Sequence, residues 1–116
     1  MKFLSLEPFV PSGKDFEKAK QFFQELGFLV SWDAGDYTGF VFGECRFILQ
    51  KYDEQFFAEN FMLSVKTDDV KSLREQILQK DLPGKYGVKI SALLQQPYGL
   101  ELNVIDMAGV CWHFVQ

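Results

Sequence analysis

The sequence predicts an α+β protein made of two βαβββ modules, whose curved mixed sheets surround a cleft. Three observations predict it. An apolar segment and an amphipathic helix open the chain, three strand-like segments follow, and the same order of elements restarts near residue 59. The 116 residues correspond to one domain with a single hydrophobic core. We therefore expect one domain, 1–116, composed of modules 1–51 and 59–116.

The first module is predicted from its start and stop signals. Residues 4–10 are apolar and end at Pro11-Ser12-Gly13, which indicates a strand followed by a turn. A helix over 14–26 is expected, with Ser12 as its N-cap, Asp15 near its positive end and Gly27 as its C-cap. Its buried face recurs at helical spacing: Phe16, Ala19, Phe22, Phe23 and Leu26.

Three segments, 28–33, 37–43 and 45–51, predict an antiparallel meander. They are rich in Phe, Val, Ile, Tyr and Trp, and turns at Gly35 and Gly43 separate them. The linker that follows, 52–58, holds two adjacent phenylalanines, Phe56 and Phe57. A solvated linker would not need them, so they predict a short helical turn packed on the core, or a cover over a cleft.

The second module repeats this order. Residues 60–65 are predicted to form a strand, and Asp68 or Asp69 is expected to cap a helix. The apolar face of that helix contains Val70, Leu73, Ile77 and Leu78. A loop is expected over 81–87, and the last three strands over 88–95, 99–105 and 110–115, with a turn at 106–109.

Composition favours binding over chemistry. Thirteen Phe, four Tyr and two Trp make up 16% of the chain, against a single His. The net charge of −4 argues against a nucleic-acid partner, since phosphate binding needs a basic face. No segment reaches the roughly 20 apolar residues of a membrane span, and the N-terminus is not a convincing signal peptide. Two cysteines predict free thiols and a cytoplasmic protein.

Strand alternation separates a core face from a mixed face. Trp112 and Phe114 alternate with Cys111 and His113, and the other strands behave alike. The purely apolar sets should lie under the helices. The mixed sets suit the concave lining of a semi-polar cavity, although a plain solvent-facing surface remains an alternative.

The chain resembles the vicinal oxygen chelate superfamily, which includes glyoxalase I, extradiol dioxygenases and antibiotic-resistance proteins. The first module carries Pro8-Phe9-Val10-Pro11, Asp15, Phe22-Phe23 and Leu26-Gly27-Phe28. The closing segment, 106–114, resembles Asp-Pro-x-Gly-Asn-x-x-x-Phe with the Pro and Asn lost. Within the superfamily it is most similar to the bleomycin resistance proteins, through Gln96-Pro97-Tyr98-Gly99 with Glu101 and through Ala108-Gly109 with Cys111, His113 and Phe114.

The resemblance implies a homodimer with clefts near the subunit interface. In metal-dependent relatives the ligands come from four strands, and the matching positions here are Pro8, Ile48 (or Gln50), Asn60 and His113. Only His113 is a good ligand, and a divalent metal needs about three strong protein donors. The metal chemistry therefore does not carry over, and no cofactor or metal is expected.

The residues expected to bind a ligand come from both modules. They are Trp32, Tyr37, Ile48, Gln50, Asn60, Met62, Tyr98, Glu101, Asn103, Cys111 and His113. The resemblance suggests that Trp32 and Tyr37 stack on a flat ligand, but they could equally form a hairpin tip packed on a partner subunit. Glu101 could attract a cation or pair with a lysine at the rim, and His113 could be a hydrogen-bonding wall or a half-buried structural residue.

No catalytic residue is predicted. Cys111 and His113 share a face, but residues two apart on a strand are about 7 Å apart, too far for direct activation. No phosphate-binding glycine loop, Ser-His-Asp set or CxxC motif is present. Together with these observations, the resemblance implies a metal-free binding protein that sequesters an aromatic or cationic, antibiotic-like molecule. The alternatives are an enzyme of the superfamily, such as a lyase, isomerase or dioxygenase, and a structural or regulatory dimer.

Overall fold

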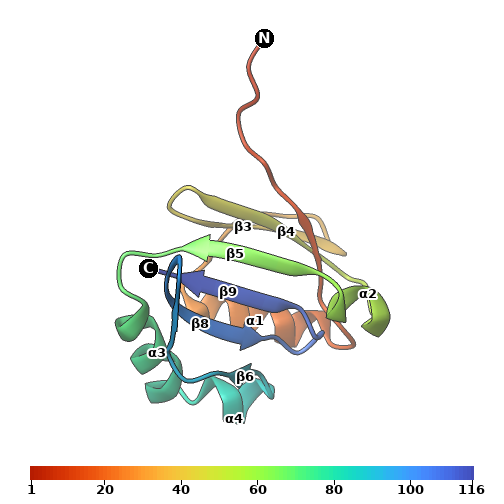
Figure 1. Ribbon diagram of the computed structural model, residues 1–116. Helices are drawn as coiled ribbons and strands as arrows, with labels where there is room; N and C mark the ends of the chain where they lie inside the picture. Colours follow the sequence, from red (N-terminus) through yellow and green to blue (C-terminus); the bar gives the residue numbers. More distant parts are fainter. The chain divides into compact units, whose positions relative to one another are not determined.

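The computed structural model describes all 116 residues and divides into two compact units, Met1–Asp53 and Glu54–Gln116. The first unit contains, in chain order, β1 (Phe9–Pro11), α1 (Phe16–Leu26), β2 (Leu29–Asp33), β3 (Tyr37–Phe42) and β4 (Cys45–Gln50). Its sheet has the order β1-β4-β3-β2, and Figure 1 shows β3 and β4 side by side. β1 is parallel to β4, whereas β4, β3 and β2 are antiparallel neighbours.

The second unit repeats this arrangement with additions. Its elements are α2 (Gln55–Glu59), β5 (Met62–Lys66), α3 (Val70–Gln79), α4 (Leu82–Tyr86), β6 (Lys89–Ile90), β7 (Leu94–Gln96), β8 (Gly99–Ile105) and β9 (Cys111–Val115). The sheet has the order β5-β9-β8-β6, and β7 also pairs with β8, at Gly99–Glu101, whereas β6 pairs with Val104–Ile105. The first strand, β5, is parallel to the last, β9, as β1 is to β4 in the first unit.

The predicted fold class, α+β with two βαβββ modules and mixed sheets, is confirmed. One predicted strand is interrupted, because 88–95 forms the short strands β6 and β7 with an irregular segment between them. The loop predicted over 81–87 is wrong, since α4 occupies it. Asp81 caps this helix by accepting from the Gly84 N–H, and Pro83 fits the first turn, where a backbone donor is not needed.

Helix α1 is capped one turn later than predicted. Its N-cap is Asp15, whose side chain accepts from the Lys18 N–H, whereas Ser12 is buried and donates to the Gly13 carbonyl. The C-cap prediction at Gly27 is confirmed. Gly27 has φ +122°, which a residue with a side chain rarely adopts, and its N–H reaches the carbonyls of Gln24 and Phe23.

Phenylalanine rings form the core of the first unit. Phe23 of α1 is fully buried, with its ring centroid 4.9 Å from that of Phe47 on β4 and 5.9 Å from that of Phe40 on β3. Phe28 closes the cluster at 5.0 Å from Phe47. The contacts show that α1 covers the sheet face that carries Phe40 and Phe47, and the alternation of residues 45–51 predicts this for Phe47.

In the second unit, the core also follows the alternation. Leu102 and Val104 of β8 and Trp112 and Phe114 of β9 are buried, as predicted. Asp69, one of the two expected caps, accepts from the Ser72 N–H at the start of α3. Val70 and Ile77 of that helix are buried, but Leu78 is 47% exposed. The prediction for Leu78 is therefore wrong.

The segment joining the modules forms a helix, but not one packed on the core through its phenylalanines. The predicted helical turn is present as α2. Phe56 is 78% and Phe57 43% exposed, and Ala58 is the buried residue. The expectation that both rings pack on the core is wrong, because a five-residue helix turns only one narrow face inward.

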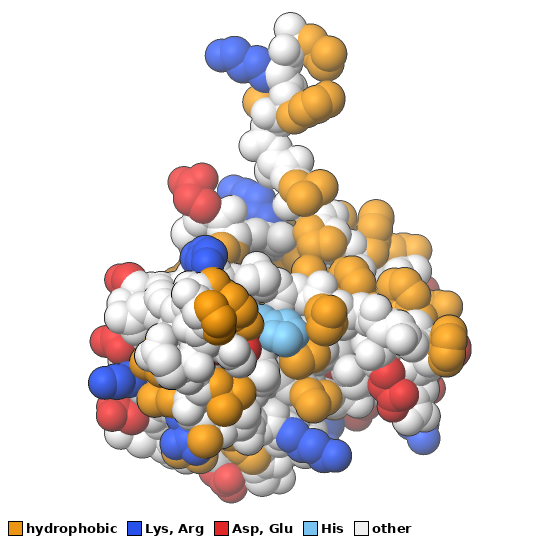
Figure 2. All heavy atoms as spheres, in the orientation of Figure 1, with side chains coloured by type: hydrophobic (Ala, Val, Ile, Leu, Met, Phe, Trp, Pro, Cys, Tyr) orange, Lys and Arg blue, Asp and Glu red, His pale blue; other side chains and the backbone are white.

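The N-terminal segment differs from its prediction. The strand expected over 4–10 is limited to β1, and residues 1–6 are exposed. The exposed residues include Phe3, Leu4 and Leu6, and Figure 2 shows hydrophobic side chains along this segment at the top of the view. No helix has the length and apolar character needed to cross a membrane.

Candidate functional site

Four predicted site residues share the face of the first sheet that α1 does not cover. The strand pairing places Trp32 beside Gly39, Gly39 beside Ile48, and Tyr37 beside Gln50. Phe9 of β1 pairs with Ile48 and lies on the same face. We name this set, Phe9, Trp32, Tyr37, Ile48 and Gln50, the aromatic face.

The rings of the aromatic face are accessible. Phe9 is 54%, Trp32 41% and Tyr37 39% exposed. Phe9 and Tyr37 contact edge to face, with ring centroids 5.9 Å apart. The Trp32 indole lies over Gly39, where any side chain would collide with it. A flat apolar surface of this kind can contact a planar molecule.

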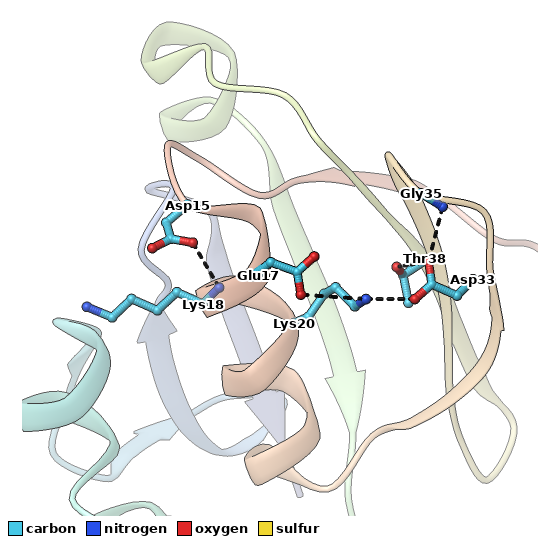
Figure 3. Close-up of polar contacts among 7 residues, drawn as sticks. All are labelled: Asp15, Glu17, Lys18, Lys20, Asp33, Gly35 and Thr38. Carbon is cyan, nitrogen blue, oxygen red and sulfur yellow. Dashed lines mark hydrogen bonds and ion pairs between the residues drawn. The ribbon is translucent and has the colours of Figure 1, made fainter.

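An ion pair anchors the hairpin between Trp32 and Tyr37 (Figure 3). Lys20 Nζ on α1 lies 2.7 Å from Asp33 Oδ2, next to Trp32, and 3.9 Å from Glu17. Asp33 also accepts from the Gly35 N–H and the Thr38 hydroxyl. The Lys20 hydrogen bond lowers the pKa of Asp33 from its ordinary value, and Asp33 raises the pKa of Lys20. These contacts fix the turn that carries both rings.

A second group of predicted residues meets on the sheet of the second unit. Glu101 on β8 is 3% exposed. Its Oε1 accepts from the Tyr98 hydroxyl at 2.9 Å and lies 3.3 Å from His113 Nδ1, while Oε2 lies 3.4 Å from the Gln96 amide nitrogen. The hydrogen bond to Glu101 raises the pKa of Tyr98. We name Gln96, Tyr98, Glu101, Asn103 and His113 the polar cluster.

Glu101 is thus not paired with a lysine at the rim. Its three partners are all polar side chains of the same unit, and His113 is the one of them that can carry a positive charge. Asn103 and His113 are direct partners on β8 and β9. Two of their atoms, Asn103 Oδ1 and His113 Nε2, are buried with no hydrogen-bond partner.

Cys111 and Met62 lie on the same sheet face as His113. They are paired with each other on β9 and β5, and Met62 is 65% exposed. Burial raises the pKa of the Cys111 thiol, and the charges of Glu101 and Asp106 raise it further. The thiolate is therefore disfavoured, which argues against Cys111 as a nucleophile.

Asn60 lies outside the sheet. It is the C-cap of α2, and its side-chain amide donates to the Phe56 carbonyl at 2.7 Å. The strand expected from residue 60 begins at Met62. The amide oxygen keeps its lone pairs, but the side chain is held by the helix end.

The residues at the four metal-ligand positions do not fit a metal. Pro8 and Ile48 have no donor side chain, Gln50, the alternative to Ile48, offers only a weakly ligating amide, and Asn60 is engaged in capping. His113 directs Nδ1 to Glu101. No group of three or more His, Cys, Asp or Glu side chains could hold a metal ion.

Two residues of these faces were not predicted from the sequence. Phe9 alternates with buried Val10, so the period-two pattern of β1 could have placed it on the aromatic face. Gln96 belongs to the Gln96-Pro97-Tyr98-Gly99 motif, but only the structure places its amide beside Glu101.

No protein-family model matches the chain, and no curated protein matches it in sequence. Solved structures do match. A bleomycin-binding protein from Streptomyces verticillus, complexed with copper(II)-bleomycin, is 24% identical with a TM-score of 0.79, over 99% of this chain and 97% of that one. A bleomycin resistance determinant encoded on the transposon Tn5 is 18% identical with a TM-score of 0.80, over 98% of both chains.

An antibiotic binding protein from Streptomyces sp. CB03234 is also similar, at 20% identity and a TM-score of 0.78, over 100% of this chain and 98% of that one. These matches span nearly the whole chain, and they confirm the fold implied by the resemblance to the vicinal oxygen chelate superfamily. The chain therefore has the fold of the bleomycin-binding and bleomycin resistance proteins.

Proposed function

We propose that this chain binds a small molecule, and that it sequesters an aromatic or cationic, antibiotic-like ligand without a metal. The aromatic face carries the proposal. Three partly exposed rings, Phe9, Trp32 and Tyr37, lie on one sheet face, opposite the face covered by α1. Stacking on a planar ligand contributes about 0.5–1.5 kcal/mol per ring pair beyond area burial. The similar solved structures include bleomycin-binding and antibiotic-binding proteins, which supports the same class of ligand.

The polar cluster supports a ligand that also carries charge or hydrogen-bonding groups. Glu101 places a carboxylate on its sheet face, and the chain as a whole carries −4. A cationic molecule would be steered toward such a protein. Each face belongs to its own unit, so each is tested by separate substitutions.

The experiment is a calorimetric titration of the protein with bleomycin and with a panel of planar cationic compounds. We expect saturable binding of at least one compound. Trp32→Ala and Tyr37→Ala should each weaken binding by roughly tenfold, the equivalent of one lost stacking contact. Phe56→Ala is the matched control, because Phe56 is an exposed aromatic residue outside both faces.

Binding by sequestration also predicts that the ligand is recovered unchanged. Mass spectrometry of the released compound should give the starting mass. Absence of binding across the whole panel would contradict the proposal, as would equal loss of binding in Phe56→Ala.

We also propose that the chain works as a cytoplasmic homodimer whose copies bring their ligand clefts to the interface. Residues 1–51 and 59–116 would be the two modules of one domain in each copy. The exposed Phe3, Leu4 and Leu6 support association, because a second copy would remove their apolar surface from water. The unpaired thiols of Cys45 and Cys111 suit a reducing compartment.

Sedimentation of the full chain should give twice the monomer mass, and Phe3→Ser with Leu6→Ser should shift it toward monomer. A wild-type protein that sediments as a monomer would rule this out.

One observation favours an enzyme as the second candidate. His113 has a carboxylate partner, Glu101, which orients an imidazole as general bases require. A change in the mass of any bound compound, lost in Glu101→Gln, would favour this alternative over sequestration.

A further inference from the structure

Asn103 and His113 present two unsatisfied atoms from directly paired positions on β8 and β9. Side chains at such positions have Cβ atoms about 4.5–5.5 Å apart and point to the same side of the sheet. Buried polar atoms in folded proteins nearly always have partners. Two without one, side by side, indicate a place where a bound group supplies the missing hydrogen bonds.

Both atoms are acceptors when the His113 imidazole is neutral. His113 Nδ1 lies 3.3 Å from Glu101 Oε1, and an ionised carboxylate can only accept. Nδ1 of a neutral imidazole therefore carries the hydrogen, and Nε2 is left with a free lone pair. Asn103 Oδ1 is a carbonyl oxygen. The partner must accordingly bring donors.

The backbone around Asn103 is held in place independently of any ligand. Its N–H donates to the Ser91 hydroxyl at 3.0 Å, and its carbonyl accepts from the Ser91 N–H at 3.0 Å. The acceptor pair is thus fixed on one side by Ser91 and on the other by Glu101. Binding of a ligand group to these two atoms therefore costs little side-chain conformational entropy.

Glu101 contributes charge rather than a further hydrogen bond. Its two oxygens already face Tyr98, Gln96 and His113. Its carboxylate also acts on Cys111, where its charge is among the causes that raise the pKa of the thiol after burial. A cationic donor is therefore favoured over a neutral one at the same distance.

We propose that His113 Nε2 and Asn103 Oδ1 together accept hydrogen bonds from the N–H groups of one cationic function of the ligand, an amidinium or an ammonium. This inference rests on the proposed binding function and specifies which chemical group the polar cluster recognises. His113 and Asn103 act as specificity-determining residues, with Glu101 and Ser91 as positioning residues.

The test compares two probes with the same ring and charge. Benzamidine carries N–H donors, whereas N,N,N′,N′-tetramethylbenzamidinium carries none. Titrations are followed by nitrogen NMR of the imidazole, which is unambiguous because the chain has a single His. We expect benzamidine to move the Nε2 resonance and to bind at least roughly tenfold more tightly than the methylated probe.

Substitutions provide the second readout. Asn103→Ala and His113→Leu should lose most of the preference for benzamidine, whereas His113→Gln, which keeps an acceptor, should retain part of it. Ser64→Ala is the matched control, because Ser64 is the exposed partner of His113 on β5. If the variants fail to fold, the comparison of the two probes on the wild-type protein still tests the inference.

Equal affinity for the two probes would overturn the inference, and so would unchanged selectivity in folded Asn103→Ala and His113→Leu. These failures differ from failure of the proposed function. A protein that binds bleomycin or planar cations but ignores N–H donors keeps its function and loses only this assignment. A protein that binds nothing in either experiment loses both.

Discussion

The indole of Trp32 lies directly over Gly39 on the neighbouring strand, so the absence of a side chain at residue 39 is what allows this ring to rest flat on the sheet. Gly39 does not have a positive φ. Its role is therefore one of space and not of backbone conformation.

Gly39→Ala should displace the Trp32 indole while leaving the fold intact. The added methyl occupies the position of the ring, which is 41% exposed and can swing toward solvent. We expect a red-shifted Trp32 emission and ligand binding about threefold to tenfold weaker, because a stacking contact is lost. In a Trp32→Ala background the same substitution should have no further effect on binding, and an equal effect there would contradict this account.

Asp106→Ala should strongly destabilise the second unit. Asp106 is buried and accepts from the backbone N–H groups of Ala108, Gly109 and Val110 and from the Trp112 indole N–H at 2.9 Å. Removing the carboxyl deprives these four N–H groups of their acceptor, which should lower the free energy of unfolding by at least about 3 kcal/mol. Chemical denaturation measures the loss. Trp112→Phe, which removes one donor of the four, should keep the β8–β9 turn intact in NMR spectra, whereas Asp106→Ala should not.

The same residue predicts a pH dependence. Burial raises the pKa of Asp106 from 3.8 to about 6, against the lowering effect of its four donors. The folded state thus favours the protonated form. Its contribution to stability is complete below the unfolded pKa and is lost as the pH rises through about 6.

As the pH rises from 3.8 to above 6, ionisation of Asp106 should therefore lower the free energy of unfolding by about 3 kcal/mol. Asp106→Asn, which cannot ionise, should remove this component, and the measurement is the difference between the denaturation curves of the two proteins across that range. Parallel pH profiles would show that Asp106 has no raised pKa.

Phe23→Ala tests the phenylalanine core of the first unit. Phe23 is fully buried among Phe22, Phe28, Phe40 and Phe47. Truncation should cost about 3–5 kcal/mol through lost burial and the cavity left behind. Phe56→Ala, at a 78% exposed position, should change stability by no more than about 0.5 kcal/mol. Similar losses in the two variants, measured by urea denaturation, would contradict the assignment of Phe23 to the core.

The sequence by itself determined which residues could share a face. Alternation and helical spacing are local properties, so they correctly placed Phe47 against α1, and Trp112 and Phe114 opposite Cys111 and His113. Gly27 and Asp69 ended and began helices as their residue types predict. Where local signals were weak, as at α4 and at Phe56, the predictions were wrong.

Only the tertiary structure decided which side chains on those faces are buried and which of them contact one another. No local pattern states that Glu101 is buried, or that Tyr98, Gln96 and His113 converge on its carboxylate, since burial depends on which strands become neighbours. Residues 101 and 113 lie twelve positions apart, and it is the register of β8 against β9 that brings them within reach. The physical reason is that side-chain direction follows from the backbone of one strand, whereas hydrogen bonding and desolvation depend on several strands at once.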